Sequence, residues 1–158
     1  MVVYTIRQMR DRADRFELER AIGFYVNRTA YVMSEEVASR FQEHGFKLSA
    51  QDFGILFRLW KQDGLSQVQI ASLMMRDKTT ITRRLDSLAK KGLIERRGDA
   101  NDRRLFRIHL TQKGMLASER LMVVVDEFQK EVLAEIPDEH KEITISTLKK
   151  ITERVTRR

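Results

Sequence analysis

The chain of 158 residues contains no cysteine, one proline and three histidines. Without cysteine it has no disulfide, thiolate metal ligand or thiol redox switch. His44, His109 and His140 are far apart in the sequence, and neither a glycine-rich phosphate loop nor an H-x-x-x-H spacing is present. No apolar run approaches the roughly 18 to 20 residues that span a bilayer. These absences argue against an enzyme, a metal or other cofactor, and a membrane partner, and they predict a cytoplasmic protein.

Charge is abundant and unevenly distributed. Apolar residues make up 42% of the chain and charged residues 34%, which favours a folded, helix-rich protein over a disordered one. Residues 61–115 contain 13 Lys or Arg and 6 Asp or Glu, whereas the other 103 residues contain 17 of each. The formal net charge of +7 therefore lies entirely on one segment, as expected if that segment anchors nucleic acid.

A long amphipathic pattern precedes the basic segment. From about residue 11 to residue 43, apolar residues recur at steps of three to four, which predicts one helix that ends at Gly45. Unbroken, its roughly 32 residues would extend about 48 Å, beyond the roughly 40 Å diameter of a compact chain of this size. A kink at Gly23 or near Asn27 is the alternative. Part of the helix is expected to project and to contact a partner. The predicted stripe is Ile22, Val26, Ala30, Met33, Val37 and Phe41.

Helix-start signals recur in the middle of the chain. Ser49 with Asp52, and Ser66 with Gln69, have the spacing of a capping box. Asp77 is a third predicted cap. The buried stripes expected in the first two helices are Phe53, Leu56, Phe57 and Trp60, and then Ile70, Ala71, Leu73 and Met74. Two helices over 112–135 and 137–157 are expected to close the chain.

The helix predicted after Asp77 has two distinct sides. At 100° per residue, Ile81, Leu85 and Leu88 lie on one side, while Thr79 and Arg83 lie on the opposite side. In a helix-turn-helix the N-terminal half of the second helix enters the major groove. Thr79 and Arg83 are therefore expected to contact base edges. The alternative is an ordinary solvated face. The neighbours expected to contact phosphates are Lys78, Thr80, Thr82 and Arg84.

Two β-rich segments, 93–97 and 105–110, flank the loop GDANDRR and predict a hairpin wing. Asp102 and Arg104 would lie on the same side of extended chain. The carboxylate could then direct the guanidinium toward a phosphate or the minor groove. Arg97 and Arg103 complete the expected wing contacts. A salt-bridged surface turn is the alternative.

The chain resembles the MarR (multiple antibiotic resistance regulator) family of bacterial transcription factors across LSQVQIASLMMRDKTTITRRLDSLAKKGLIERRGDANDRRLFRIHLTQKG. The wing signature D-x-R is present as residues 102–104 and is followed by L-T-x-x-G as residues 110–114. The resemblance covers nearly the whole chain and is weakest at its two ends. It implies a mainly α fold with a small β-hairpin, in which residues 48–111 form a winged helix-turn-helix domain and residues 1–47 and 112–158 form a helical dimerisation region.

The resemblance also implies an obligate homodimer on a palindromic operator in double-stranded DNA. Arg83 would be the major-groove residue, and Arg103 and Arg104 the wing residues. Most such proteins repress promoters and are released by a small effector, commonly phenolic or anionic. Two alternatives remain, namely a winged-helix protein that coats DNA without sequence preference and one that binds another protein. Residues on elements that frame the family's effector pocket, although more typical of a core, are Tyr25, Tyr31, Met33, His44, Phe46 and Phe53.

Overall fold

A computed structural model of the chain describes residues 17–98 and 106–157. They contain the 3₁₀ helix η1 (Leu18–Arg20), six α-helices and a three-stranded sheet, which confirms the expected mainly α class with a small hairpin. None of the described helices combines the length and the hydropathy of a membrane-spanning segment. The elements are α2 (Ile22–Glu43), α3 (Ala50–Lys61), β1 (Leu65–Ser66), α4 (Gln67–Met74), α5 (Lys78–Lys90), β2 (Ile94–Gly98), β3 (Phe106–Leu110), α6 (Gln112–Val132) and α7 (Asp138–Thr156).

The chain divides into two compact units, Met1–Gly54 and Ile55–Arg158. In the first unit, α2 begins at Ile22 because Ala21 is extended, with φ −82° and ψ 117°. The expectation of one helix through this point is therefore wrong, and residues 11–16 lie outside the described part. α2 is continuous past Gly23 and Asn27, so the helix is not interrupted at either position where a kink was expected. Its 22 residues extend about 33 Å, which removes the length argument for a projecting helix.

Burial along α2 is confined to its C-terminal half. Val37 and Phe41 are buried, whereas Ile22 is 61% exposed, Val26 and Ala30 are exposed as well, and Met33 is half-buried. The helix ends in a turn in which Gly45 has φ +83°, and the N–H of Phe46 donates to the carbonyl of Phe41 at 2.8 Å. The N-terminal half of α2 therefore presents an uncovered apolar stripe in the single chain.

The predicted capping box at Ser49 is present at the start of α3. The N–H of Asp52 donates to Ser49 Oγ at 3.2 Å, and the N–H of Ser49 donates to Asp52 Oδ2 at 3.0 Å. These reciprocal bonds satisfy two donors that the first turn of a helix leaves unpaired. In the first unit the Phe53 ring lies 5.7 Å from the Phe41 ring, centroid to centroid.

In the second unit, α3 buries Leu56 as expected, but aliphatic neighbours take the place of the expected aromatic residues. Ile55, Leu56 and Leu59 are fully buried, whereas Phe57 is half-buried and Trp60 is 39% exposed. Lys61 Nζ lies 5.4 Å from the centroid of the Trp60 ring, a cation–π distance that suits a partly solvated aromatic. The apolar periodicity was consistent with either set, and the branched side chains fill the core.

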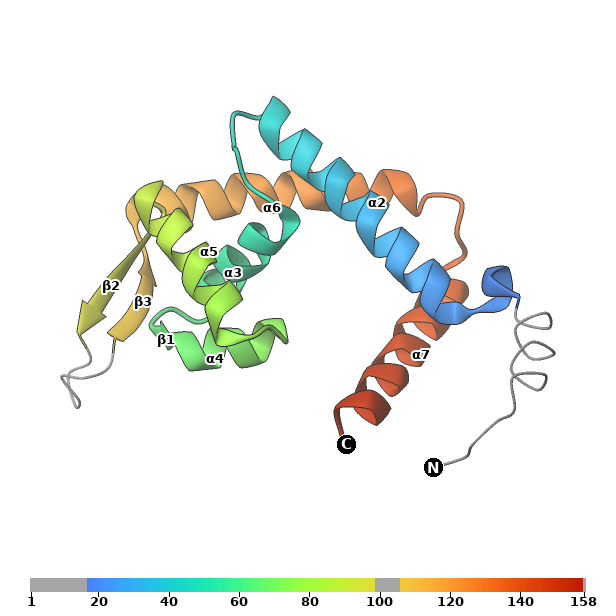
Figure 1. Cartoon of the computed structure of the whole chain (residues 1–158). Helices are drawn as coiled ribbons and strands as arrows, with labels where there is room; N and C mark the ends of the chain where they lie inside the picture. Colours follow the sequence, from blue (N-terminus) through green and yellow to red (C-terminus); the bar gives the residue numbers. More distant parts are fainter. Residues whose placement is uncertain (1–16, 99–105, 158) are drawn as a thin grey trace. The chain divides into compact units, whose positions relative to one another are not determined.

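The sheet has the strand order β1-β3-β2, and both pairings are antiparallel (Figure 1). β2 and β3 form the expected hairpin, with Ile94 opposite Leu110 and Gly98 opposite Phe106. β1 was not expected. Its Leu65 is buried and lies opposite Ile108, so the residues just before α4 join the hairpin.

The last two helices differ in burial. α6 buries a regular stripe of Ala117, Leu121, Val124 and Phe128, whereas α7 has no buried residue. The prediction of two closing helices is confirmed, with ends at Val132 and Thr156. The apolar residues that α7 leaves exposed are Ile143, Ile145, Leu148, Ile151 and Val155.

Candidate nucleic-acid interface

α4 and α5 form two consecutive helices that pack against each other within the second unit (Figure 1). The predicted capping box at Ser66 is present, since the N–H of Gln69 donates to Ser66 Oγ at 3.2 Å and the N–H of Ser66 donates to Gln69 Oε1 at 2.8 Å. α4 ends at Met75, whose φ of +50° is left-handed. Asp77 then begins α5, so a three-residue turn separates the helices.

Asp77 caps α5 as predicted. Its carboxylate accepts the N–H of Thr80 at 2.8 Å and the hydroxyl of Thr80 at 2.6 Å. The hydroxyl and then the backbone hydrogen bond of Thr80 lower the pKa of Asp77 below its ordinary value. The ionised carboxylate lies at the positive end of the helix dipole. The predicted apolar face is confirmed, because Ile81, Leu85 and Leu88 are all fully buried.

The opposite face of α5 carries Lys78, Thr79 and Arg83, which are exposed. Thr79 and Arg83 make no side-chain hydrogen bond or ion pair with another described residue. The N–H groups of this guanidinium and the O–H of this hydroxyl are therefore available to a ligand. An Arg side chain can donate to guanine O6 and N7 at the same time. The structure thus brings together the two residues that were predicted to contact bases.

Two of the predicted phosphate contacts are in different surroundings. The hydroxyl of Thr82 donates to the carbonyl of Lys78 at 2.8 Å and accepts from Gln67 Nε2 at 2.5 Å. Its hydroxyl, like that of Thr80, is therefore hydrogen-bonded within the protein, and a phosphate contact of either residue stays a prediction. Arg84 is half-buried on the flank of α5, between the apolar and the exposed faces.

The hairpin is joined to α5 by an ion pair that the sequence did not reveal. Arg96 of β2 donates to Asp86 of α5 at 2.6 Å. Arg97, a predicted wing contact, is exposed and bonds Glu95 of the same strand, with Nε 3.0 Å from the carboxylate. The other predicted wing residues, Asp102, Arg103 and Arg104, lie outside the described residues.

A second unpredicted link ties the turn before β1 to β3. Asp63 accepts from the Nδ1 side of His109 at 2.7 Å and from the backbone N–H of Leu110 at 3.0 Å. Partial burial alone would raise the pKa of Asp63. The hydrogen bonds from His109 and Leu110 lower the pKa by more than burial raises it, so the pKa lies below its ordinary value. The carboxylate and its partners are 46 and 47 positions apart, which is why no local pattern indicated this link.

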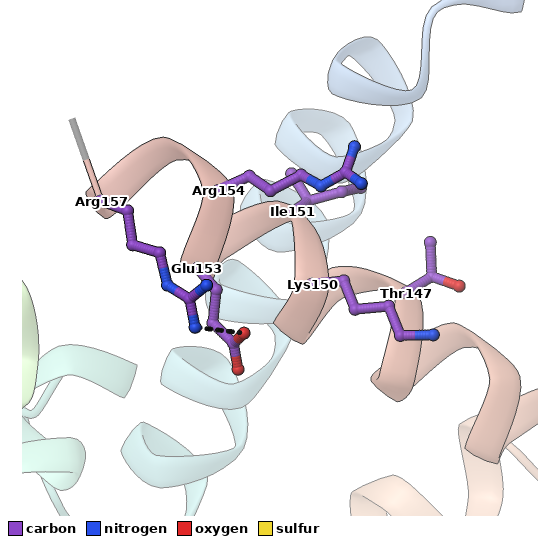
Figure 2. A pocket seen from close by; sticks show the side chains of 6 residues that line it. All are labelled: Thr147, Lys150, Ile151, Glu153, Arg154 and Arg157. Carbon is purple, nitrogen blue, oxygen red and sulfur yellow. Dashed lines mark ion pairs between the residues drawn. The ribbon is translucent and has the colours of Figure 1, made fainter.

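A hollow of about 380 Å³ lies beside α7 and carries a cationic lining (Figure 2). Lys150, Arg154 and Arg157 follow one another at i, i+4 and i+7, and Arg157 lies 3.6 Å from Glu153. Thr147 and Ile151 add a hydroxyl and an apolar wall. This arrangement has the donors to hold a small anion with an apolar portion.

A capped helix pair, a second helix with an exposed polar face and an adjoining antiparallel hairpin define a winged helix-turn-helix. A sequence model of the MarR family matches residues 48–106. The transcriptional regulator PecS of Dickeya dadantii is 32% identical over 99 residues, which are 61% of this chain and 60% of PecS. Residues 48–106 are therefore similar to the MarR family, and the longer matched segment is similar to a protein named as a transcriptional regulator. The matched segment spans about three-fifths of PecS.

Solved structures extend the likeness beyond that segment. The regulator BldR of Sulfolobus solfataricus has a TM-score of 0.73 and 27% identity, covering 82% of this chain and 91% of BldR. CouR of Rhodococcus jostii RHA1, bound to p-coumaroyl-CoA, has a TM-score of 0.74 and 26% identity, covering 85% of this chain and 94% of CouR. A repressor CouR bound to a 23-mer DNA duplex has a TM-score of 0.78 and 24% identity, covering 86% and 95%.

Proposed function

We propose that the protein binds a palindromic operator in double-stranded DNA as a homodimer in the cytoplasm, represses transcription there, and is released by a small phenolic or anionic effector. The observation that carries DNA recognition is the exposed face of α5, where Thr79 and Arg83 stand opposite a fully buried apolar face. The burial of Ile81, Leu85 and Leu88 holds the helix, and the cap at Asp77 leaves its N-terminal turn free to enter a major groove.

Charge supports the same assignment. All of the net positive charge lies in residues 61–115, which include α4, α5 and the hairpin. Cations there attract phosphates and release counterions on binding, which supplies affinity independent of sequence. In this proposal Lys78, Thr80 and Arg84 contact DNA phosphates. The DNA contacts of the wing involve Arg97, Asp102, Arg103 and Arg104. Known relatives in this fold bind DNA, including CouR and MepR of S. aureus.

Dimerisation is supported by the apolar residues that the single chain leaves uncovered. The N-terminal half of α2 and the whole of α7 present exposed Ile, Leu and Val side chains, and such surface normally marks an interface. We assign residues 1–47 and 112–158 to the dimerisation region and residues 48–111 to DNA binding. A two-fold axis would then set two α5 helices about one helical turn of DNA apart, roughly 34 to 36 Å.

The basic hollow beside α7 supports an anionic effector. Lys150, Arg154 and Arg157 offer charge-assisted bonds to a carboxylate or phosphate. CouR, a relative, binds p-coumaroyl-CoA, a molecule with both a phenol and phosphates. Release requires that the effector prefer a dimer in which the two α5 helices are wrongly spaced for DNA.

The test compares affinity for a palindrome found beside the protein's own reading frame with affinity for the scrambled sequence at one salt concentration. We expect a strong preference for the palindrome. The Arg83→Ala variant should lose about 1 to 3 kcal/mol on the palindrome and relax base preference at one position. Salicylate, which carries a phenol and a carboxylate, is the probe for release. Equal affinity for both DNAs would favour the architectural alternative.

A further inference from the structure

We infer that Gln67 is a positioning residue for base recognition, because its side chain fixes the first turn of α5 through Thr82 and the backbone of Lys78. We call these three groups the Gln67 clamp. The inference rests on the proposed function, because it concerns how α5 is held in the orientation in which it can distinguish one base sequence from another.

The clamp is a closed set of hydrogen bonds at the crossing of two helices. Gln67 is the first residue of α4, and its Nε2 donates to Thr82 Oγ1 at 2.5 Å and reaches the carbonyl of Lys78 at 3.4 Å. The Thr82 hydroxyl donates to the same carbonyl at 2.8 Å. The Gln67 amide and the Thr82 hydroxyl thus both point at the carbonyl oxygen of Lys78. Because the two groups are also bonded to each other, each restricts the rotation of the other.

The α5 residues of the clamp adjoin the residues that face bases. Lys78 precedes Thr79, and Thr82 precedes Arg83, one helical turn later. A bidentate bond from Arg to guanine requires donor–acceptor distances of about 2.7 to 3.2 Å at both atoms. A displacement of the first turn by a fraction of an ångström therefore changes which base edge Arg83 can satisfy.

α4 is itself held by the sheet, so the clamp has a fixed base. Gln69 Oε1 accepts from the Ser66 N–H at 2.8 Å and from Arg107 Nη1 of β3 at 3.3 Å. The N-terminal turn of α4 therefore carries two amide side chains, one directed at the hairpin strand and one at α5. Gln67 therefore fixes the first turn of α5 relative to the sheet, because α4 is bonded to both.

Two competing roles give different results. If Thr82 contacts a phosphate, its loss weakens binding to every DNA sequence to the same extent. If the clamp contributes only to folding stability, its loss lowers the free energy of unfolding and leaves sequence preference unchanged. Positioning instead changes the ratio of affinities for the palindrome and for scrambled DNA.

The experiment measures that ratio at fixed salt for the full chain and for Gln67→Ala, Thr82→Val, Thr82→Ser and the Gln67→Ala/Thr82→Val double variant. Valine keeps the volume of threonine and removes the hydroxyl, whereas serine keeps the hydroxyl. We expect each of the first two variants to lower the ratio about two- to tenfold, the range of one hydrogen bond. The double variant should be no worse than either, because the residues act as one unit. Thr82→Ser should keep the full ratio.

Urea unfolding and amide hydrogen exchange of Thr82 and Arg83 are measured on the same variants without DNA. Faster exchange at these two amides in Gln67→Ala supports the clamp. Equal losses on both DNAs, additive losses in the double variant, or a high ratio kept by both single variants would overturn the inference and leave the proposed function standing. A wild-type ratio near one would overturn both.

Discussion

Gly114, in the first turn of α6, approaches the backbone at the base of the hairpin, and a single methyl group there should be costly. A Cβ at this position would lie 1.9 Å from the carbonyl oxygen of Leu93 and 2.9 Å from its carbonyl carbon. Both atoms belong to the backbone, so no side chain can turn aside. The Gly114→Ala variant therefore requires α6 and the start of β2 to separate by about 1 Å or more, in an interior that is close-packed.

The magnitude follows from three terms. Overpacking of a buried site costs about 3 kcal/mol at the upper end of its usual range. The Leu93 carbonyl also accepts the N–H of Thr111 at 3.1 Å, and separation would weaken this bond by about 1 kcal/mol. Alanine is the better helix former by about 1 kcal/mol, which offsets part of the loss. We expect Gly114→Ala to lower the free energy of unfolding by about 3 kcal/mol.

Urea denaturation at one protein concentration measures this difference, and the fixed concentration matters for a protein proposed to dimerise. Gly23→Ala is the matched control, because Gly23 is helical and its Cβ would meet no atom within 4 Å. The control should keep or slightly raise stability. A Gly114→Ala protein as stable as the wild type would refute the close approach of α6 to Leu93.

Three further results are expected. Arg104→Ala should bind DNA more weakly with a shallower salt dependence, the slope falling by about 0.9 for one lost phosphate contact; an unchanged slope would contradict its assignment. Val155→Asp should shift the protein from dimer to monomer in sedimentation, whereas Ser146→Asp, on the other side of α7, should not. Because the folded pKa of Asp63 is depressed, its stabilisation is present above its ordinary pKa of 3.8 and is lost as pH falls through the lower folded value. Asp63→Asn should abolish that part of the acid dependence in pH-resolved unfolding, and an identical acid profile would count against it.

The sequence predicted the parts of the fold that depend on neighbours in the chain. The caps at Ser49, Ser66 and Asp77 are present because a side chain three residues from its partner is enough to form them. The buried face of α5 was predictable for the same reason, since the spacing of its apolar residues fixes which side can enter a core.

Features that depend on distant residues were not predictable. The Arg96–Asp86 pair, the Asp63–His109 bond and the clamp between Gln67 and Thr82 each join separate elements. The start of α2 at Ile22 was missed because the apolar repeat continues across the break at Ala21. An apolar stripe shows which side of a helix is suited to burial, but it does not show where the backbone leaves the helical conformation.

β1 has a consequence for the order in which the domain forms. Its two residues pair with β3, so that Leu65 meets Ile108 and the whole of α4, α5 and β2 lies in the closed loop between them. Closing so long a loop costs entropy before any contact across it is gained. The hairpin and α5 should therefore gain and lose structure in one cooperative step. A substitution that destabilises the hairpin should therefore also destabilise α5.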